Sequence, residues 1–247
     1  MFFGLTNSPA TFQAMMDHIL QPWADKWAQE DMKGSWYMDD VLVVSRNKRK
    51  HQQATHELLE ILAANDLFLK PEKCVWEQPC VDYLGLILEE GVTRMDLAKI
   101  AGIATWPTPT SVKQVQSFLG FCNFYRLFIY QFSHIARPLN ELTRKETPWT
   151  WGERQQEAFE TLRKRITSKP VLKQPQLEQP FEVEVDTSGY AIGAVLMQRD
   201  EKGKRHPVAY FSSTLNEAKC NYDIYTVMIR TYKTEFYLFL RVLILES

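Results

Sequence analysis

Two adjacent carboxylates, Asp39 and Asp40, are the side chains best suited to chemistry in this sequence. They follow Tyr37 and Met38 and are flanked by apolar β-forming residues, which predicts a hairpin over residues 35–45 with the acidic pair at its turn. Burial of an unpaired carboxylate costs several kcal/mol, so the pair must lie at the surface or beside a cation. Mg²⁺ prefers carboxylate oxygens, and a two-metal centre for phosphoryl transfer requires acidic groups close together. A solvated acidic turn is the alternative for the dipeptide alone.

Helices and short strands are predicted on both sides of this hairpin in the chain. Ser8 is expected to cap a helix whose first turn contains Pro9. A second helix is expected over residues 48–65, followed by short strands over 67–69 and 81–88. Helix, hairpin, helix and strands in this order are typical of an α+β layer.

A proline-rich break over residues 106–110 separates this layer from the second part of the chain. The next segment, 111–145, has helical periodicity and many aromatic residues, and Ser111 is its expected cap. We predict that these aromatic side chains form a core rather than a platform for stacked bases. The later elements are expected to be a helix over 153–167 and two paired strands over 181–186 and 191–198.

The composition is that of an ordinary globular protein. The 247 residues are 45% hydrophobic and 24% charged, and the net charge of −1 does not indicate a nucleic-acid partner. The charge is uneven, because residues 111–173 contain eleven Lys or Arg against five Glu. This excess suits a surface that contacts a nucleic-acid backbone, although a solvated helix face is equally common.

Targeting and membrane signals are not predicted. The first residues lack the pattern of a signal peptide, and the apolar run over 236–245 is too short to span a bilayer. The four cysteines are widely spaced without a CxxC pair, which favours free thiols in a reducing compartment. We therefore expect a soluble intracellular protein without a membrane partner, located in the cytoplasm or the nucleus.

Further short motifs accompany the acidic hairpin in a fixed order. They are FGLTNSPATFQ (3–13), LKPEKC (69–74), YLG (83–85), WPTP (106–109), QSFLGFCNFYR (116–126), PVL (170–172), DTS (186–188), GAVL (193–196) and HPVAY (206–210). One YxDD stretch alone is a weak signal, whereas this series of motifs is a strong one. The order and spacing resemble reverse transcriptases of long-terminal-repeat retrotransposons of the Ty3/gypsy class, and the resemblance covers nearly the whole chain.

The resemblance implies an α+β fold built from parts of a Pol polyprotein. It places a partial polymerase palm, without the fingers and the first palm strands, over residues 1–95. Thumb or connection helices would occupy residues 96–147. An incomplete ribonuclease H-like α/β domain would follow over 148–247, with the family pattern lost towards its end.

The resemblance also implies metal-binding carboxylates. Asp39 and Asp40 correspond to acids of the polymerase centre, where two Mg²⁺ ions would activate the primer 3′-hydroxyl and neutralise charge on the departing pyrophosphate. Asp186 corresponds to the first metal-binding Asp of ribonuclease H, where Mg²⁺ serves hydrolysis of RNA in a hybrid. The implied partners are an RNA template, a DNA primer, their hybrid duplex and deoxynucleoside triphosphates.

Substrate-binding residues are implied as well. Tyr37 and Met38 are similar to residues that pack under the primer terminus. Gly4 and Gln13 belong to an element that resembles the lining of the nucleotide pocket, where Gln13 would contact the template or the incoming base. The primer grip would be Tyr83-Leu84-Gly85. The alternatives are a turn with a helix surface for the pocket element and a buried strand end for the grip.

Three departures from the family pattern reduce the expected activity. The family has a further metal-binding Asp on a strand that would precede Gly4, upstream of this chain's first residue. The next ribonuclease H carboxylate is expected at Met228, whose thioether cannot hold Mg²⁺. The pattern is lost after Tyr225, before the remaining acids of that site.

We therefore expect a truncated, weakly active or inactive copy of an RNA-directed DNA polymerase with ribonuclease H. Uncovered sheet edges and apolar helix faces would favour self-association or a partner subunit. One alternative is a non-catalytic protein that binds nucleic acid or another subunit. Another is an inert gene remnant, which would give insoluble or degraded product.

Overall fold

The computed structural model describes residues 6–30, 32–176 and 178–215. Contacts between residues divide the chain into two compact units, with the division between Gln78 and Pro79. The described residues up to Gln78 are called unit 1 and those from Pro79 onward unit 2, and each unit is described separately. None of the described helices is long and apolar enough to cross a membrane.

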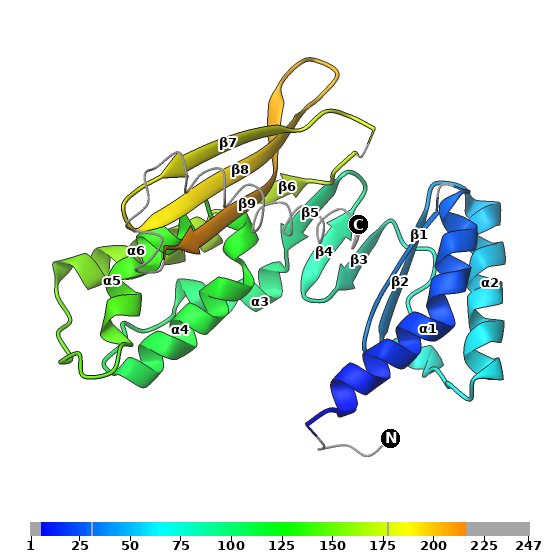
Figure 1. The fold of residues 1–247 in the computed structure, drawn as a ribbon, viewed down its shortest axis with the longest axis horizontal. Helices are drawn as coiled ribbons and strands as arrows, with labels where there is room; N and C mark the ends of the chain where they lie inside the picture. Colours follow the sequence, from blue (N-terminus) through cyan, green and yellow to red (C-terminus); the bar gives the residue numbers. More distant parts are fainter. Residues whose placement is uncertain (1–5, 31, 177, 216–247) are drawn as a thin grey trace. The chain divides into compact units, whose positions relative to one another are not determined.

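Unit 1 is an antiparallel hairpin with two helices beside it. The strands are β1 (Met32–Tyr37) and β2 (Asp40–Ser45), and the helices are α1 (Ser8–Ala28) and α2 (Lys48–Ala64). The two helices lie side by side next to the hairpin (Figure 1). A short 3₁₀ turn, η1 (Pro71–Lys73), follows α2.

A single tryptophan joins the three parts of unit 1. The Trp23 ring on α1 packs over Gly34 of β1 so closely that a Cβ added at Gly34 would lie 2.4 Å from ring atom Cζ3. The Trp23 Nε1–H donates a buried hydrogen bond to the Ala54 carbonyl of α2 at 3.0 Å. The other buried members of this core are Met16, Leu20, Met32, Leu58 and Leu62. The hairpin is therefore held in place by helix packing across one of its faces.

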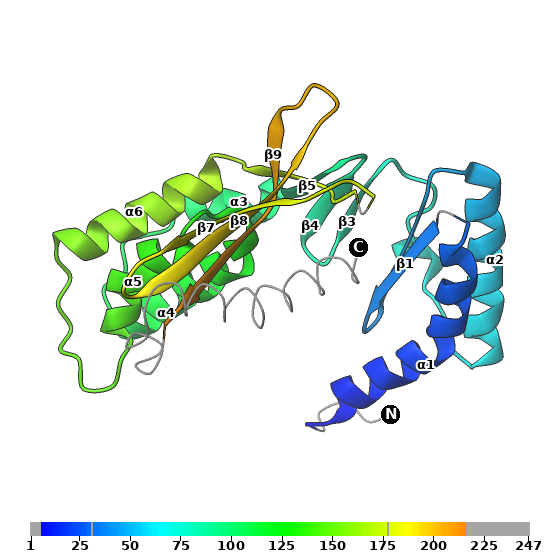
Figure 2. The same cartoon turned by 45° about the horizontal axis from the view of Figure 1, so that its top comes forward.

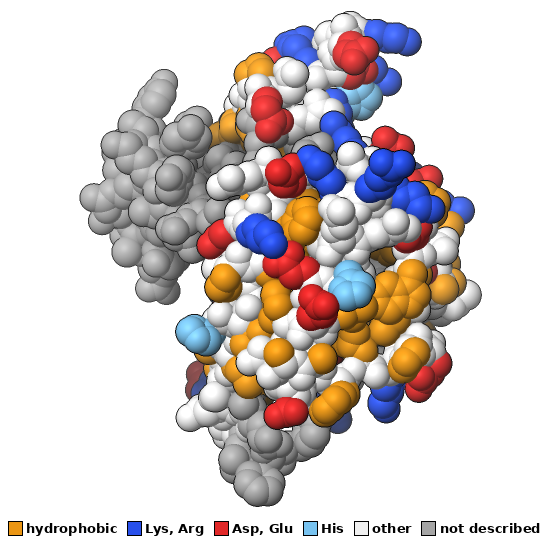
Figure 3. Space-filling model, turned by 90° about the vertical axis from the view of Figure 1, so that its right-hand side faces the viewer, with side chains coloured by type: hydrophobic (Ala, Val, Ile, Leu, Met, Phe, Trp, Pro, Cys, Tyr) orange, Lys and Arg blue, Asp and Glu red, His pale blue; other side chains and the backbone are white. Residues whose placement is uncertain are grey.

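The surface seen in Figure 3 has no field of a single charge sign. Acidic and basic side chains are interspersed there, with hydrophobic side chains among them. This mixture agrees with the net charge of −1.

Most predicted elements of unit 1 are confirmed. The hairpin over 35–45 is present with longer strands, and the second helix ends one residue before the predicted end. The helix start differs, because α1 begins at Ser8 with Asn7 in the N-cap position. The strand predicted over 67–69 is wrong: Phe68 is 84% exposed, and no strand of the described residues pairs with this segment.

Unit 2 contains two antiparallel sheets and several helices. The first sheet has the order β3 (Cys80–Tyr83), β4 (Leu86–Glu89), β5 (Val92–Met95) and β6 (Val171–Lys173). The second sheet has the order β7 (Glu182–Thr187), β8 (Ala191–Arg199) and β9 (Arg205–Thr214). The connecting helices are α3 (Leu97–Ala104), α4 (Val112–Phe124), η2 (Arg126–Phe128), α5 (Phe132–Leu142) and α6 (Glu153–Thr167). In both Figure 1 and Figure 2, α4 and α5 lie beneath the second sheet.

The aromatic residues of the predicted segment 111–145 mostly form core. Phe118 and Tyr125 are buried, and Phe118 packs on Phe159 of α6 with 4.6 Å between ring centroids. Phe124 is the exception among them, since it is 55% exposed. The prediction of a core rather than a stacking platform therefore holds for the buried rings. A smaller cluster on the second sheet contains Ala194, Leu196 and Val208.

The predicted strand over 81–88 is wrong, because the chain turns within it. Tyr83 pairs with Leu86, so Leu84 and Gly85 form a two-residue turn with φ values of +49° and +78°. Positive φ at both central residues is the pattern of a type I′ hairpin turn. Leucine is an unusual residue for that position, so the sequence alternation alone did not indicate the turn.

The remaining helix and strand predictions in unit 2 are confirmed with one change. Ser111 caps α4, since its hydroxyl accepts a hydrogen bond from the Gln114 N–H at 3.4 Å. The helical segment 111–145 is interrupted by η2 and restarts after Gln131, which has a left-handed φ of +55°. The predicted helix 153–167 is present, and β7 and β8 begin or end within one residue of the predicted bounds.

The grouping of elements differs from the predicted domain edges at 95 and 147. Strand β6, from the region assigned to ribonuclease H, pairs with β5, from the region assigned to the palm, in the register Thr93↔Leu172. Residues 80–95 thus belong to unit 2 by their contacts. The predicted edges at 95 and 147 are boundaries between family domains, whereas the units are defined by contacts. The predicted edges therefore stay predictions.

Candidate functional site

The acidic pair lies at the tight turn of the β1–β2 hairpin. Tyr37 pairs with Asp40, which leaves Met38 and Asp39 as the two turn residues. Met38 has a φ of +52°, and among the two turn residues only Met38 has a positive φ, which is the pattern of a type II′ turn. A left-handed conformation costs a residue with a side chain roughly 1–2 kcal/mol. Such a turn needs support from outside the hairpin.

Gln13 of α1 supplies that support. Its Oε1 accepts a hydrogen bond from the Met38 N–H at 2.8 Å, and its Nε2 donates to Asp17 Oδ1 at 2.9 Å. The Nε2 also lies 3.4 Å from the Trp36 carbonyl. The Trp36 Nε1–H donates to the same Asp17 oxygen at 2.8 Å. These contacts fix the end of β1 and the first residue of the turn to α1.

Asp39 and Asp40 are both exposed, so the turn presents two carboxylates to solvent. Carboxylate oxygens are the donors that Mg²⁺ prefers, and two neighbouring acids fit part of its coordination. In the described part of the chain, no group of three or more His, Cys, Asp or Glu side chains could hold a metal ion. The pair therefore offers two ligands without a complete set. Gly4 lies outside the described residues.

The side chains next to the acidic pair differ in exposure. Tyr37 is 54% exposed and leaves much of its ring surface free, whereas Met38 is half-buried. The assigned contacts of Tyr37, Met38 and Gln13 with a primer, template or nucleotide stay predictions. In this structure the Gln13 amide is already used by the hairpin backbone, which the sequence did not indicate.

The predicted primer grip is the β3–β4 turn of unit 2. Leu84 is 39% exposed at this turn, and the Phe124 ring packs on Gly85. A Cβ at Gly85 would lie 3.0 Å from Phe124 Cζ, and its φ of +78° is a conformation that favours glycine. Asp82 beside the turn pairs with Lys99 at 2.9 Å. The turn is thus fixed to α3 and α4 of the same unit.

Asp186 on β7 is the first of three residues that pair across the neighbouring strands of the second sheet. Asp186 pairs with Gly193, and Gly193 pairs with Ser212. The Gln131 side chain crosses over the first two of these residues: its Nε2 donates to Asp186 Oδ2 at 2.6 Å, and its Cγ would lie 3.3 Å from a Cβ at Gly193. No sequence pattern indicates Gln131 as a partner of Asp186, from which it is separated by 55 residues.

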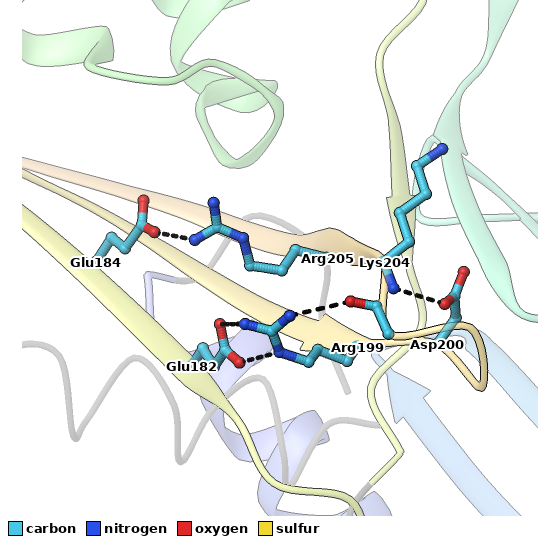
Figure 4. Close-up of polar contacts among 7 residues, drawn as sticks. Glu182, Glu184, Arg199, Asp200, Lys204 and Arg205 are labelled. Carbon is cyan, nitrogen blue, oxygen red and sulfur yellow. Dashed lines mark hydrogen bonds and ion pairs between the residues drawn. The ribbon is translucent and has the colours of Figure 1, made fainter.

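The other acidic residues of β7, Glu182 and Glu184, form ion pairs with arginines. Glu184 and Glu182 are two and four residues from Asp186 on the strand, so the three side chains point to one face. Glu182 accepts hydrogen bonds from Arg199 at 2.5 and 3.2 Å, and Glu184 pairs with Arg205 (Figure 4). No ion pair of Asp186 is present in the described chain, where its partner is the Gln131 amide. A carboxylate cluster for Mg²⁺ is therefore not formed here by the described residues.

Two protein-family models match this chain and identify its family. A family described as "Reverse transcriptase (RNA-dependent DNA polymerase)" matches residues 1–88. A second, "RNase H-like domain found in reverse transcriptase", matches residues 151–244. This chain belongs to the retrotransposon reverse transcriptases. The predicted family membership is confirmed.

Pol polyproteins of known transposons match most of this chain. The retrovirus-related Pol polyprotein from transposon opus of Drosophila melanogaster is 34% identical over 231 residues, which are 89% of this chain and 22% of that protein. The transposon Tf2-3 polyprotein of Schizosaccharomyces pombe is 31% identical over 223 residues, which are 90% of this chain and 16% of that protein. The chain therefore spans about a fifth of the length of these relatives.

Solved reverse transcriptases share the fold. The foamy viral protease-reverse transcriptase in complex with dsDNA is 21% identical with a TM-score of 0.72, and the match covers 100% of this chain and 49% of that chain. The same protein in complex with an RNA/DNA hybrid has a TM-score of 0.75, with 100% of this chain and 32% of that chain covered. The predicted fold class, a polymerase part followed by a ribonuclease H-like part, is confirmed.

Proposed function

We propose that this chain is the part of a retrotransposon RNA-directed DNA polymerase that presents the Asp39–Asp40 pair to the primer terminus. The observation that supports this proposal is the acidic turn, in which Met38 has a positive φ. Gln13 of α1 stabilises this turn by accepting a hydrogen bond from the Met38 N–H at 2.8 Å. The turn lies within the residues that match the reverse transcriptase family. Backbone strain held by outside contacts is typical of functional sites.

Asp39 and Asp40 would hold Mg²⁺, and both families generally depend on divalent metals. When bound, the metal supplies activation of the primer 3′-hydroxyl and neutralisation of charge on the pyrophosphate. The protein residues have separate tasks in this proposal. The two carboxylates orient toward solvent, Gln13 fixes the turn, and the exposed Tyr37 ring offers a surface for the terminal nucleotide.

The proposed partners are an RNA template, a DNA primer, their hybrid duplex and deoxynucleoside triphosphates. The related foamy viral proteins were solved with dsDNA and with an RNA/DNA hybrid. In this chain the excess of Lys and Arg over residues 111–173 supports contact with a phosphate backbone. Self-association or a partner subunit stays a further proposal, because the described surface carries exposed apolar side chains such as Phe68 and Val75.

For the isolated chain we expect little or no polymerase or nuclease activity. Among the described residues the hairpin offers two metal ligands. Asp186 is not part of a group of described acids that could hold a metal ion, since Glu182 and Glu184 on the same strand form ion pairs with arginines. A metal held by two carboxylates is bound weakly and positioned poorly. Asp186 as a metal ligand of ribonuclease H stays a prediction, and Met228 lies outside the described residues.

Primer extension tests this proposal. Purified chain is incubated with Mg²⁺, an RNA template and a labelled DNA primer, alongside Asp39→Ala and a control, Asp25→Ala, on the exposed side of α1. We expect little extension by all three proteins, together with duplex binding by fluorescence anisotropy. Sustained synthesis that Asp39→Ala abolishes and Asp25→Ala retains would refute the low activity while supporting the role of the pair. No duplex binding at low salt would refute the proposed partners.

A further inference from the structure

The Asp17 carboxylate of α1 accepts two hydrogen bonds at one of its oxygens. Its Oδ1 atom accepts from Gln13 Nε2 at 2.9 Å and from Trp36 Nε1 at 2.8 Å. Gln13 lies four residues earlier on the same helix face, and Trp36 is the next-to-last residue of β1. Asp17 therefore contacts both the helix residue that supports the acidic turn and the strand that leads into this turn.

The orientation of the Gln13 amide determines whether it can support the turn. A side-chain amide has an oxygen that accepts hydrogen bonds and an NH₂ group that donates them. The Met38 N–H is a donor, so Gln13 supports it only when Oε1 faces it, as it does at 2.8 Å. If the amide were reversed, two donors would face each other, and the bond to the left-handed Met38 would be lost.

Asp17 favours the supporting orientation because a carboxylate accepts hydrogen bonds and donates none. The Gln13 NH₂ group must face Asp17 to form a bond there, and Oε1 is then left for the Met38 N–H. The indole N–H of Trp36 is also a donor, so its bond to the same oxygen holds the carboxylate beside Gln13. The Trp36 carbonyl, 3.4 Å from Gln13 Nε2, adds a second acceptor for the NH₂ group.

A second pair on α1 has the same spacing without the contacts to the hairpin. Gln21 Nε2 donates to Asp25 Oδ1 at 2.7 Å, and both residues are exposed. Among the described residues, neither of these side chains bonds to β1, to β2 or to the turn between them. Stabilisation of the helix surface accounts for this pair, whereas the Gln13–Asp17 pair also reaches a strand and a turn.

We propose that Asp17 is a positioning residue for the acidic turn, because it sets the Gln13 amide in the orientation that supports Met38. The turn is then held in one conformation, which presents Asp39 and Asp40 together. This inference rests on the proposed function, in which the two carboxylates would hold Mg²⁺. Asp17 acts through Gln13 and is not itself a metal ligand. Ligands whose supporting hydrogen bonds are lost bind a metal more weakly.

Mn²⁺ titration of the full chain tests this assignment. Mn²⁺ takes the same oxygen ligands as Mg²⁺, and its paramagnetism broadens the NMR signals of nearby amides. Asp17→Ala is compared with the wild type and with Asp25→Ala as the matched control. We expect Asp17→Ala to weaken Mn²⁺ binding several-fold, as read from the amides of residues 38–41, to shift the Met38 amide signal and to speed its hydrogen exchange. Asp25→Ala should change none of these readouts.

Two further variants separate the position of Asp17 from its charge. Asp17→Asn removes the charge and keeps an oxygen that can accept from both donors, so it should restore the Mn²⁺ affinity and the Met38 signal. Equal losses in Asp17→Asn and Asp17→Ala would assign the effect to charge and overturn the inference. In a Gln13→Ala background, Asp17→Ala should cause no additional loss, and an additional loss would contradict action through Gln13. Circular dichroism confirms that each variant is folded, and Asp17→Ser replaces Asp17→Ala if that protein does not fold.

The results distinguish this inference from the proposed function. If Mn²⁺ broadens no amide over residues 38–41 of the wild type, the proposed metal role fails. The Met38 signal and its exchange rate then decide the inference, which is supported by a change in Asp17→Ala that Asp17→Asn reverses. If the wild type binds Mn²⁺ at the turn and Asp17→Ala behaves like Asp25→Ala in every readout, Asp17 does not position the turn and the proposed metal role stands.

Discussion

The Oε1 atom of Gln13 accepts a hydrogen bond from the Met38 N–H at 2.8 Å and so ties α1 to the turn that carries Asp39. Met38 has a positive φ, and its N–H would otherwise be left half-buried at the most strained point of the hairpin. The position of the acidic pair therefore depends on a helix residue that lies 25 positions before Met38 in the chain.

Gln13→Ala should destabilise unit 1 by about 1 kcal/mol, the usual contribution of one hydrogen bond with a partly buried partner. Urea unfolding followed by circular dichroism measures the change. Gln21→Ala is the matched control, because Gln21 bonds Asp25 at 2.7 Å on the same helix, as Gln13 bonds Asp17, but has no hairpin contact among the described residues. Equal effects of the two substitutions would contradict the role of Gln13 in supporting the turn.

Gly34→Ala should destabilise unit 1 by about 1–3 kcal/mol, because the new methyl would lie 2.4 Å from the Trp23 ring. The ring cannot retreat without breaking its buried bond to the Ala54 carbonyl. Thermal unfolding provides the measurement. Gly102→Ala in α3 is the control, since nothing lies within 4 Å of its Cβ and alanine favours a helix. An unchanged melting temperature for Gly34→Ala would show that this packing is looser than described.

Asp186→Ala should lower the stability of unit 2 by about 1 kcal/mol, whereas Asp186→Asn should lower it much less. The asparagine retains an oxygen that can accept the bond from Gln131 Nε2, which measures 2.6 Å in the native chain. The comparison uses urea unfolding of both variants in metal-free buffer. A double-mutant cycle with Gln131→Ala isolates the coupling between the two side chains. Additive effects would mean that this contact contributes nothing to stability.

Glu57→Gln should change how the free energy of unfolding depends on pH. A hydrogen bond from Lys26, whose Nζ lies 2.7 Å from Oε2, is the largest cause that lowers the pKa of Glu57 below its ordinary 4.5. Because the folded pKa is the lower one, this stabilisation is present above pH 4.5 and is lost as the pH falls through the folded pKa. Since both side chains are partly exposed, we expect Glu57→Gln to lower stability at pH 7 by less than about 1 kcal/mol.

Urea midpoints measured between pH 3 and pH 7 check this expectation for Glu57. The variant should lose less stability than the wild type on acidification. A variant curve parallel to the wild-type curve would contradict the assignment to Glu57.

The sequence predicts those elements whose signals are local. The hairpin over 35–45 combines alternating apolar residues with an acidic turn, and the helix over 153–167 has a regular apolar spacing, so both are recovered. The acidic pair could be placed at the turn for the same reason. These signals need no knowledge of the rest of the fold.

Long-range contacts account for the features that sequence reasoning did not predict. The pairing of β5 with β6 joins strands that are separated by four α-helices and the 3₁₀ helix η2. The turn at Leu84 depends on strand pairing, and Phe124 packs against its second residue, Gly85. Gln131 meets Asp186 only after α5 has docked on the second sheet. Each of these depends on where distant segments meet, which residue types alone do not encode.

The burial of Cys122 makes the helical core of unit 2 measurable by chemical labelling. Cys122 is fully buried, and burial raises the pKa of its thiol to about 12, so the reactive thiolate is scarce at neutral pH. Cys80 is exposed and Cys74 is half-buried, so both react without opening that core. The alkylation rate at Cys122, mapped by mass spectrometry, therefore reports how often the core opens, while Cys80 in the same chain serves as the internal standard.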